Sequence, residues 1–169
     1  MDKVITTALL IVISMVLALV LFNAAYPAIN QGGDAINNMA SRQEDRMKSE
    51  ISIIHAAGEL DSTGQWQDTN GDGQFNVFVW VKNTGATTIS ALNTADLFFG
   101  REGNFVRIPY GSNPNGFPFW TASLASGSDW TPTNTLQITL HYGSPLQTGR
   151  YYVKVTTPNG IVDQYFLGM

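Results

Sequence analysis

The chain has 169 residues, a formal net charge of −4 at pH 7 and no cysteine. The acidic balance argues against nucleic-acid binding, which needs clustered Lys and Arg side chains to replace the counterions of the phosphates. Without disulfides, a domain outside the cell depends on its core, on bound ions or on assembly. The length suffices for one long helix and one domain of roughly 110 residues.

The first long segment is apolar. Residues 4–22 read VITTALLIVISMVLALVLF without a charge, and the next charged residue is Asp34. A helix of this length spans about 28 Å, close to the roughly 30 Å of a bilayer's hydrocarbon core. Thr6, Thr7 and Ser14 can bond back to helix carbonyls, so they are compatible with an apolar helix. The segment therefore needs lipid or other copies of itself around it.

A cleaved secretory signal is one alternative for this segment, because Ala24 and Ala25 resemble a cleavage site. Such a signal has a positive flank and an apolar core of about 7–15 residues. Here the run is longer, and the flank of Asp2 and Lys3 has little net charge. We therefore expect the segment to be retained. A plain single-pass membrane anchor stays open as a second alternative.

A helical pattern continues beyond the apolar run. The pair Tyr26-Pro27 is expected to kink the helix or to mark its exit from the apolar layer. Charged residues then alternate with apolar ones at helical spacing, and the apolar positions are Ile36, Met39 or Ala40, Met47, Ile51 and Ile54. We predict one helix from about residue 3 to about residue 58, within an N-terminal domain of residues 1–60. It would be roughly 80 Å long, far longer than a bilayer requires.

From Trp66 the period of the apolar pattern changes from 3.6 to 2, which indicates strands. The predicted strands are residues 75–82, 88–92, 96–99, 104–108, 136–142, 151–156 and 161–167. Residues 111–119 are rich in Pro and Gly and are predicted to form a loop. About seven short strands predict an immunoglobulin-like sandwich over residues 61–169. The fold class is therefore α+β, a long hydrophobic helix followed by an all-β sandwich.

Residues 68–73 read DTNGDG and match the pattern D-x-[DN]-x-D-G of calcium loops. An EF-hand is excluded, because position twelve, which would hold a bidentate Glu, is Val79. The alternative is an Asx-rich turn in which the same side chains bond the backbone. Calcium is the one cofactor that the sequence suggests. Its predicted ligands are the side chains of Asp68, Asn70 and Asp72 and the main-chain carbonyl of Gln74.

No other motif carries recognisable chemistry. His55 and His141 stand in no motif, and the sequence holds no nucleophile elbow, phosphate loop or paired-carboxylate pocket, so we expect no enzyme. The tryptophans leave sugar stacking open as an alternative, although packing in the core or at contacts is the simpler expectation. They are Trp66, Trp80, Trp120 and Trp130.

This layout resembles the archaellins, the archaeal flagellins, together with the accessory proteins of the archaellum. The specific part is VWVKNTG at residues 79–85, followed by DLFFG at residues 96–100. The resemblance implies a secreted subunit that a prepilin-type peptidase processes, that inserts into the membrane and that then joins an extracellular helical filament. Its partners would be its own copies, the membrane before assembly, and the platform and motor proteins of the archaellum. Ile5 stands where bacterial type IV pilins commonly have Glu, which favours the archaeal group.

A helix that is apolar all round is buried on every side, and in a filament its neighbours would be the same segments of other copies. We predict a structural subunit of an archaellum-type motility filament. A membrane-anchored accessory or stator protein and an adhesive type IV-like pilin are the alternatives. The predicted assembly core consists of Val4, Ile5, Leu9, Leu10, Ile11, Val12, Ile13, Met15, Val16, Leu17, Leu19, Val20, Leu21 and Phe22.

Overall fold

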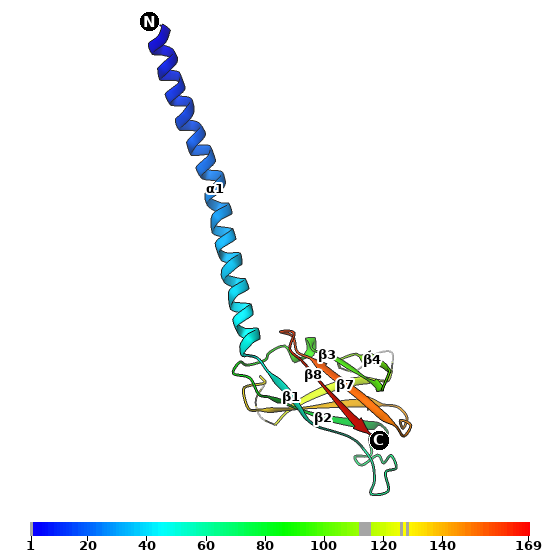
Figure 1. Ribbon diagram of the computed structural model, residues 1–169. Coiled ribbons are helices and arrows are strands. Elements are labelled where there is room, and N and C mark those ends of the chain that lie inside the picture. Colours follow the sequence, from blue (N-terminus) through cyan, green and yellow to red (C-terminus); the bar gives the residue numbers. More distant parts are fainter. Residues whose placement is uncertain (1, 112–115, 126, 128) are drawn as a thin grey trace. The chain divides into compact units, whose positions relative to one another are not determined.

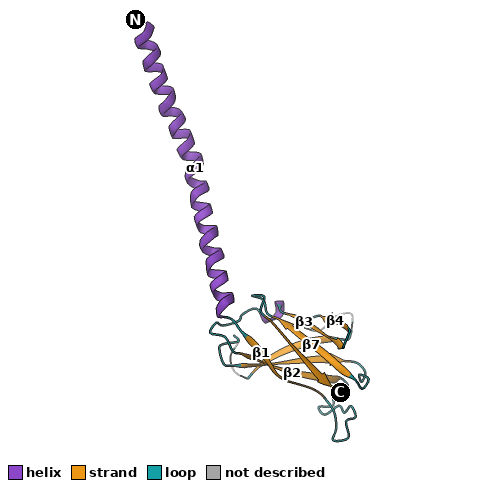
Figure 2. Cartoon of the chain, in the orientation of Figure 1, coloured by secondary structure: helices purple, strands orange, loops and turns teal. Residues whose placement is uncertain are grey.

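The computed structural model describes residues 2–111, 116–125, 127 and 129–169 (Figure 1). The chain divides into two compact units, Met1–Glu44 and Asp45–Met169. The first unit is helical and the second is a β-sandwich that includes the last turn of the helix (Figure 2). This is the predicted α+β fold with an immunoglobulin-like sandwich, and the described residues form eight strands where about seven were predicted. The elements are α1 (Asp2–Lys48), β1 (Ile51–Gly58), β2 (Phe75–Asn83), the 3-10 helix η1 (Leu92–Thr94), β3 (Asp96–Arg101), β4 (Asn104–Ile108), β5 (Phe119–Leu124), β6 (Thr135–Tyr142), β7 (Arg150–Thr156) and β8 (Val162–Gly168).

Helix α1 is shorter than the sequence predicted. It continues through Pro27 as one element and ends at Lys48, whereas the prediction extended it to about residue 58. That prediction was wrong, because Ile51 and Ile54 fit a helical period but belong to strand β1. The β-branched side chains of Ile51 and Ile53 are instead buried in the sandwich, where a pleated strand accommodates them well. The register of β1 shifts between Ile53 and His55, which leaves Ile54 exposed.

Two four-stranded antiparallel sheets form the sandwich. One has the order β1-β2-β6-β5 and the other the order β4-β3-β7-β8. On one side the edge strands β1 and β8 meet, and the Ile53 N–H donates to the Asp163 carboxylate at 2.6 Å. On the other side Tyr110, just beyond β4, bridges to Trp120 at the start of β5.

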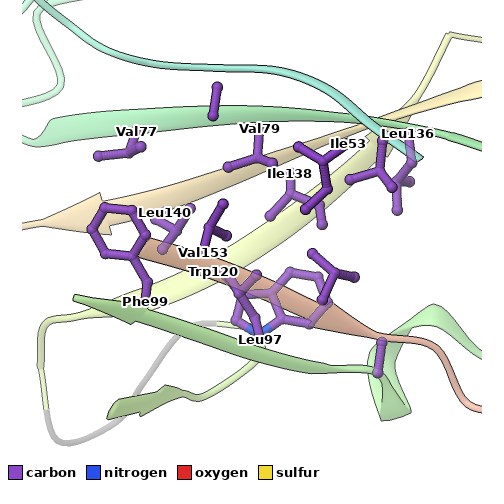
Figure 3. Close-up of a cluster of buried hydrophobic side chains, with 14 of the residues drawn as sticks. Ile53, Val77, Val79, Leu97, Phe99, Trp120, Leu136, Ile138, Leu140 and Val153 are labelled. Carbon is purple, nitrogen blue, oxygen red and sulfur yellow. The ribbon is translucent and has the colours of Figure 1, made fainter. Parts of the chain in front are cut away.

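The core lies between the two sheets. Val77, Val79 and Val81 of β2 alternate with outward residues and are fully buried, as the period of two predicted. Figure 3 shows Val77 and Val79 facing side chains from the opposite sheet, among them Leu97 and Val153. Burial of each such side chain contributes roughly 1.5–3 kcal/mol, which is how the sandwich holds together without a disulfide.

The strand predictions fail at two places. Residues 88–92 form no strand, because Ile89 makes only a single bridge to Trp130 before η1 begins. Strand β5 was missed, although Trp120 within it is 1% exposed and lies in the core. Its inward positions are few, and it follows directly on Pro118, which suggested a loop. Of that predicted loop, residues 112–115 lie outside the described part of the chain.

Candidate functional site

The apolar segment of α1 is the most distinctive surface of the first unit. It contains an 18-residue window of mean hydropathy 2.9, and the helix is long and apolar enough to cross a membrane. Side chains on every face of the segment are uncovered, from Val4 at 75% exposure to Phe22 at 64%. Every residue of the predicted assembly core lies on this surface. Burying these side chains in lipid or protein is worth roughly 1.5–3 kcal/mol for each large one.

Two of the hydroxyl groups in this segment, those of Thr7 and Ser14, bond to carbonyls within the helix. The Thr7 hydroxyl donates to the Lys3 carbonyl at 2.8 Å. The Ser14 hydroxyl lies 2.8 Å from the Leu10 carbonyl and 3.0 Å from the Ile11 carbonyl. These bonds confirm the back-bonding expected from the sequence, and they leave a lateral surface suited to hydrocarbon. From Val4 to the first later charge at Asp34, the uncharged stretch covers about 45 Å of helix, the full thickness of a bilayer with its headgroups.

The end of α1 is tied to the sandwich by a buried serine. Ser49 is 7% exposed, and its hydroxyl donates to the Asp45 carbonyl at 2.6 Å. The Asn159 amide donates to the Ser49 oxygen at 2.7 Å, and the Thr87 hydroxyl lies 2.5 Å from the same oxygen. The Arg46 guanidinium reaches the Gly160 carbonyl at 3.4 Å. The last helical turn is therefore bonded to the β2–η1 connection and to the β7–β8 turn.

The VWVKNTG stretch forms the other half of this junction. The Thr84 and Gly85 N–H groups both donate to the Glu50 carbonyl at 3.0 Å, and the Ala86 N–H donates to the Lys48 carbonyl at 2.8 Å. A Cβ atom on Gly85 would lie 2.4 Å from the Glu50 nitrogen and 2.6 Å from the Lys48 oxygen. Glycine is thus required here by the close approach of two backbones.

Asn83 fixes the shape of that turn. Its side chain is fully buried, and its amide group donates to the Thr87 and Trp130 carbonyls, both at 2.9 Å. Its Oδ1 accepts from the Gly85 N–H at 3.1 Å. The sequence singled out this stretch by resemblance alone. Its structural role, holding the chain where the helix ends, needed the coordinates, because Lys48–Glu50 and residues 83–87 are far apart in sequence.

The predicted calcium loop is ordered by its own carboxylates. Asp68 accepts from the N–H groups of Gly71, Asp72 and Gly73 at 2.7, 3.2 and 2.8 Å. The Asp72 carboxylate accepts from the Asn70 amide at 2.9 Å and from the Gln74 N–H at 2.8 Å. These are the bonds of an Asx-rich turn. Among the described residues no three His, Cys, Asp or Glu side chains cluster closely enough to hold a metal ion.

Three neighbouring features still suit a cation at this loop. Asn76 is 1% exposed and occupies position nine of the calcium pattern. Neither its buried Oδ1 nor the buried Gln74 Oε1 has a hydrogen-bond partner among the residues that the structure describes. Burial favours a raised pKa for Asp72, but hydrogen bonds from Asn70, Gln74 and Asn76 outweigh it and lower that pKa. Calcium binding at Asp68, Asn70, Asp72 and Gln74 stays a prediction.

A buried carboxylate holds this loop against the sandwich. Glu59 is 4% exposed and was not singled out from the sequence. It accepts from the Thr69 N–H at 2.9 Å, from the Thr69 hydroxyl, and from the Asn76 N–H and amide at 3.2 and 3.1 Å. Its Oε1 serves the loop and its Oε2 serves β2. The only signal in the sequence would have been an acidic residue directly after the apolar strand β1.

The histidines and tryptophans mostly play packing roles. Trp120 and Trp130 are buried in the core, and the Trp66 indole donates to the Leu146 carbonyl at 2.8 Å. The His55 ring of β1 stacks on the Trp80 ring of β2, with ring centroids 5.3 Å apart. His141 stacks on Phe119 at 4.6 Å, and burial lowers its pKa although the charge of Asp72 opposes that shift. These contacts agree with the packing roles expected for both residue types.

Comparisons with known proteins show which proteins this chain resembles. No family model matches the chain. An uncharacterized protein of Archaeoglobus fulgidus is 21% identical over 169 residues, covering 97% of each chain. Among solved structures, the archaellum periplasmic stator protein FlaG of Sulfolobus acidocaldarius is 26% identical, with a TM-score of 0.53, over 70% of this chain and 99% of that one.

Two further structures give the same picture. The stator complex of FlaF and FlaG from Sulfolobus acidocaldarius matches with 26% identity and a TM-score of 0.51 over 69% of this chain and 87% of that one. The archaeal flagellin FlaB1 of Methanocaldococcus jannaschii matches with 11% identity and a TM-score of 0.50, over 72% of this chain and 90% of that one, a likeness of fold. The chain is thus similar to proteins of the archaellum, and the archaellin-like resemblance drawn from its sequence is confirmed.

Proposed function

We propose that the chain is a stator-type component of an archaellum, held in the membrane by α1 and presenting its β-sandwich outside the membrane. The observation that carries this proposal is the likeness to the solved FlaG chain, which extends over 99% of that chain and 70% of this one at 26% identity. The flagellin, at 11% identity, shares the fold alone. The partner class would be other archaellum proteins, since the neighbouring stator structure is a complex of FlaF with FlaG.

The apolar segment supports an anchor on physical grounds. Its uncharged stretch matches the thickness of one bilayer, and the hydroxyls of Thr7 and Ser14 bond within the helix. The junction at Ser49 and Gly85 would then fix the last turn of α1, from Asp45 to Lys48, to the sandwich through several hydrogen bonds.

A filament subunit is the second candidate function. It is favoured by one observation: α1 has 47 residues and is uncovered all round through its apolar half. In a filament the assembly core from Val4 to Phe22 would be buried among copies of itself. The flagellin likeness supports the fold that such a subunit needs.

Fractionation of cells separates the two candidates. Sheared filaments and alkali-washed membranes are collected, and the chain is quantified in each by mass spectrometry. A stator component is expected in the washed membranes and absent from the main filament band. Recovery of the chain as the dominant filament protein would overturn the stator proposal in favour of the filament subunit.

A variant tests the role of the helix itself. Leu10→Asp places a charge in the middle of the apolar segment, and insertion of Asp at a helix centre costs about 2.5–3.5 kcal/mol. We expect a smaller fraction of this variant than of Leu10→Ala to be recovered in alkali-washed membranes, because the apolar residues of the segment offset only part of the penalty. Equal recovery of the two variants would argue against burial of Leu10 in lipid.

A further inference from the structure

The edge strand β4 is unusually open. It stands at the end of its sheet, next to β3 (Figure 1), and among the described residues β3 is its only strand partner. Of its residues only Ile108 is buried, while Phe105 is 45% and Val106 is 58% exposed. The edges β1 and β8 cover each other, and β5 is joined to Tyr110. Natural edges are often protected from pairing by charged side chains, a proline or a bulge. Strand β4 contains no proline or bulge, and its one charged side chain, Arg107, is paired with Asp96 on the neighbouring strand β3.

Apolar groups lie on both faces of this edge. On the outer face, the Phe105 ring lies 4.7 Å from Tyr152, which in turn lies 5.2 Å from Phe166. These aromatic residues form a row across the sheet, with Gly100 between β4 and β7. On the other face, Val106 borders a hollow of about 380 Å³ between the sheets. An added strand would cover both faces at once.

We propose that β4 pairs antiparallel with β4 of a second copy, about a twofold axis at Val106. Residues whose numbers sum to 212 then face each other, so Val106 meets its own copy and Phe105 lies opposite Arg107 of the other chain. Phe105 and Arg107 share the outer face, and Arg107 is held there by Asp96, with 2.5 Å between Nε and the carboxylate. Each Phe105 ring thereby gains a cation from the other chain.

The neighbouring registers are less favourable. An axis at Arg107 would set the two guanidinium groups opposite each other, which is destabilising. An axis at Phe105 would place Arg107 opposite Gly103, which has a φ of 82° in the β3–β4 turn and cannot extend the strand. Charge and turn geometry thus select the axis at Val106.

We assign a second copy of this chain as the partner of β4, because in this register Phe105 of one copy lies opposite Arg107 of the other. A strand of this length buries less than the roughly 1,200–2,000 Å² of a stable interface. Pairing therefore depends on chains already held side by side, which raises their effective concentration. Anchoring of α1 in one membrane, or its burial among other copies, would in either case confine the chains and raise their effective concentration, so the inference does not depend on the choice between stator and filament subunit.

The absence of cysteine makes the test direct. Full-length Val106→Cys is reconstituted in lipid vesicles and oxidised mildly, and dimers are counted on a non-reducing gel. Directly opposed residues of an antiparallel pair have Cα atoms about 4.5–5.5 Å apart, within reach of a disulfide. Val162→Cys, at a 48% exposed position on β8, is the control for random collision.

We expect Val106→Cys to form dimers at least about tenfold faster than Val162→Cys, because pairing holds the thiols together. Differently tagged Phe105→Cys and Arg107→Cys chains should cross-link to each other faster than either cross-links to itself. Equal rates for Val106→Cys and Val162→Cys would overturn the pairing. Faster self-linkage of Phe105→Cys would overturn the register, and capture of a different protein by Val106→Cys in native membranes would overturn the second copy as occupant.

Discussion

Replacing Gly85 by Ala tests whether the junction between the helix end and β2 holds the sandwich together. The added Cβ would lie 2.4 Å from the Glu50 nitrogen, 2.6 Å from the Lys48 oxygen and 2.9 Å from the Ser49 Cα. All three are main-chain atoms, so no side-chain rotation relieves the overlap. The two backbones must separate, which weakens the three N–H bonds from residues 84–86 to the Glu50 and Lys48 carbonyls.

The expected loss follows from those bonds. At about 0.5–1.5 kcal/mol for each net hydrogen bond, weakening three costs roughly 2–4 kcal/mol of unfolding free energy. For a unit the size of Asp45–Met169 this corresponds to a Tm lower by roughly 10 °C. The control is Gly168→Ala, since a Cβ there meets nothing within 4 Å. Without a clash, that exchange should leave Tm within about 2 °C or raise it slightly.

Thermal unfolding of the full chain in detergent provides the measurement. Its four tryptophans all lie in the sandwich unit, so their fluorescence reports this unit and not the apolar helix. The reasoning is refuted if Gly85→Ala unfolds within about 2 °C of both the natural chain and Gly168→Ala. In that case the backbones would separate at little cost, and the bonds to Glu50 would contribute little.

Two further predictions concern the loop before β2. Glu59→Ala leaves the N–H groups of Thr69 and Asn76 without their buried acceptor, so we expect the free energy of unfolding in urea to fall by about 3 kcal/mol. The control Glu102→Ala removes an exposed ion pair with Arg150 at 3.4 Å and should lower it by less than about 1 kcal/mol. Equal losses in the two variants would contradict the role of Glu59. If calcium binds the loop, a chelator lowers Tm in the natural chain but not in Asp68→Ala; an unchanged Tm, with no metal found by elemental analysis, would leave only the Asx-rich turn.

The sequence predicted the secondary structure well where the apolar residues followed a single period. The alternation around Val77, Val79 and Val81 located β2, because a half-buried strand must present every second residue to the core. Sequence periodicity gave the wrong element at Ile51, because the spacing of this residue from Met47 fits a helix. Only pairing with Asn83 across the sheet decides that this segment is a strand, and such a contact is invisible in a local pattern. The missed strand β5 has the same cause.

The candidate site was predictable to a similar degree. Composition alone identified the apolar segment, since no partner is needed to recognise a long uncharged run. The junction and Glu59 were not recognised, because their importance lies in bonds between distant residues such as Ser49 and Asn159. A buried carboxylate looks like a surface one in sequence. Its burial becomes evident only when the loop that covers it is placed.

The junction matters equally for both candidate functions. A tether that only retains a protein at a membrane can be flexible, and glycine- or serine-rich linkers serve that purpose. Here only Ser49 and Glu50 separate α1 from β1, and both are bonded to the sandwich. The β-branched strand β1 then continues directly into the core. A load on the sandwich is thus passed through main-chain bonds to the last turn of α1. A stator component and a filament subunit would each need the end of α1 to stay attached to the sandwich, so this junction would serve either proposed function.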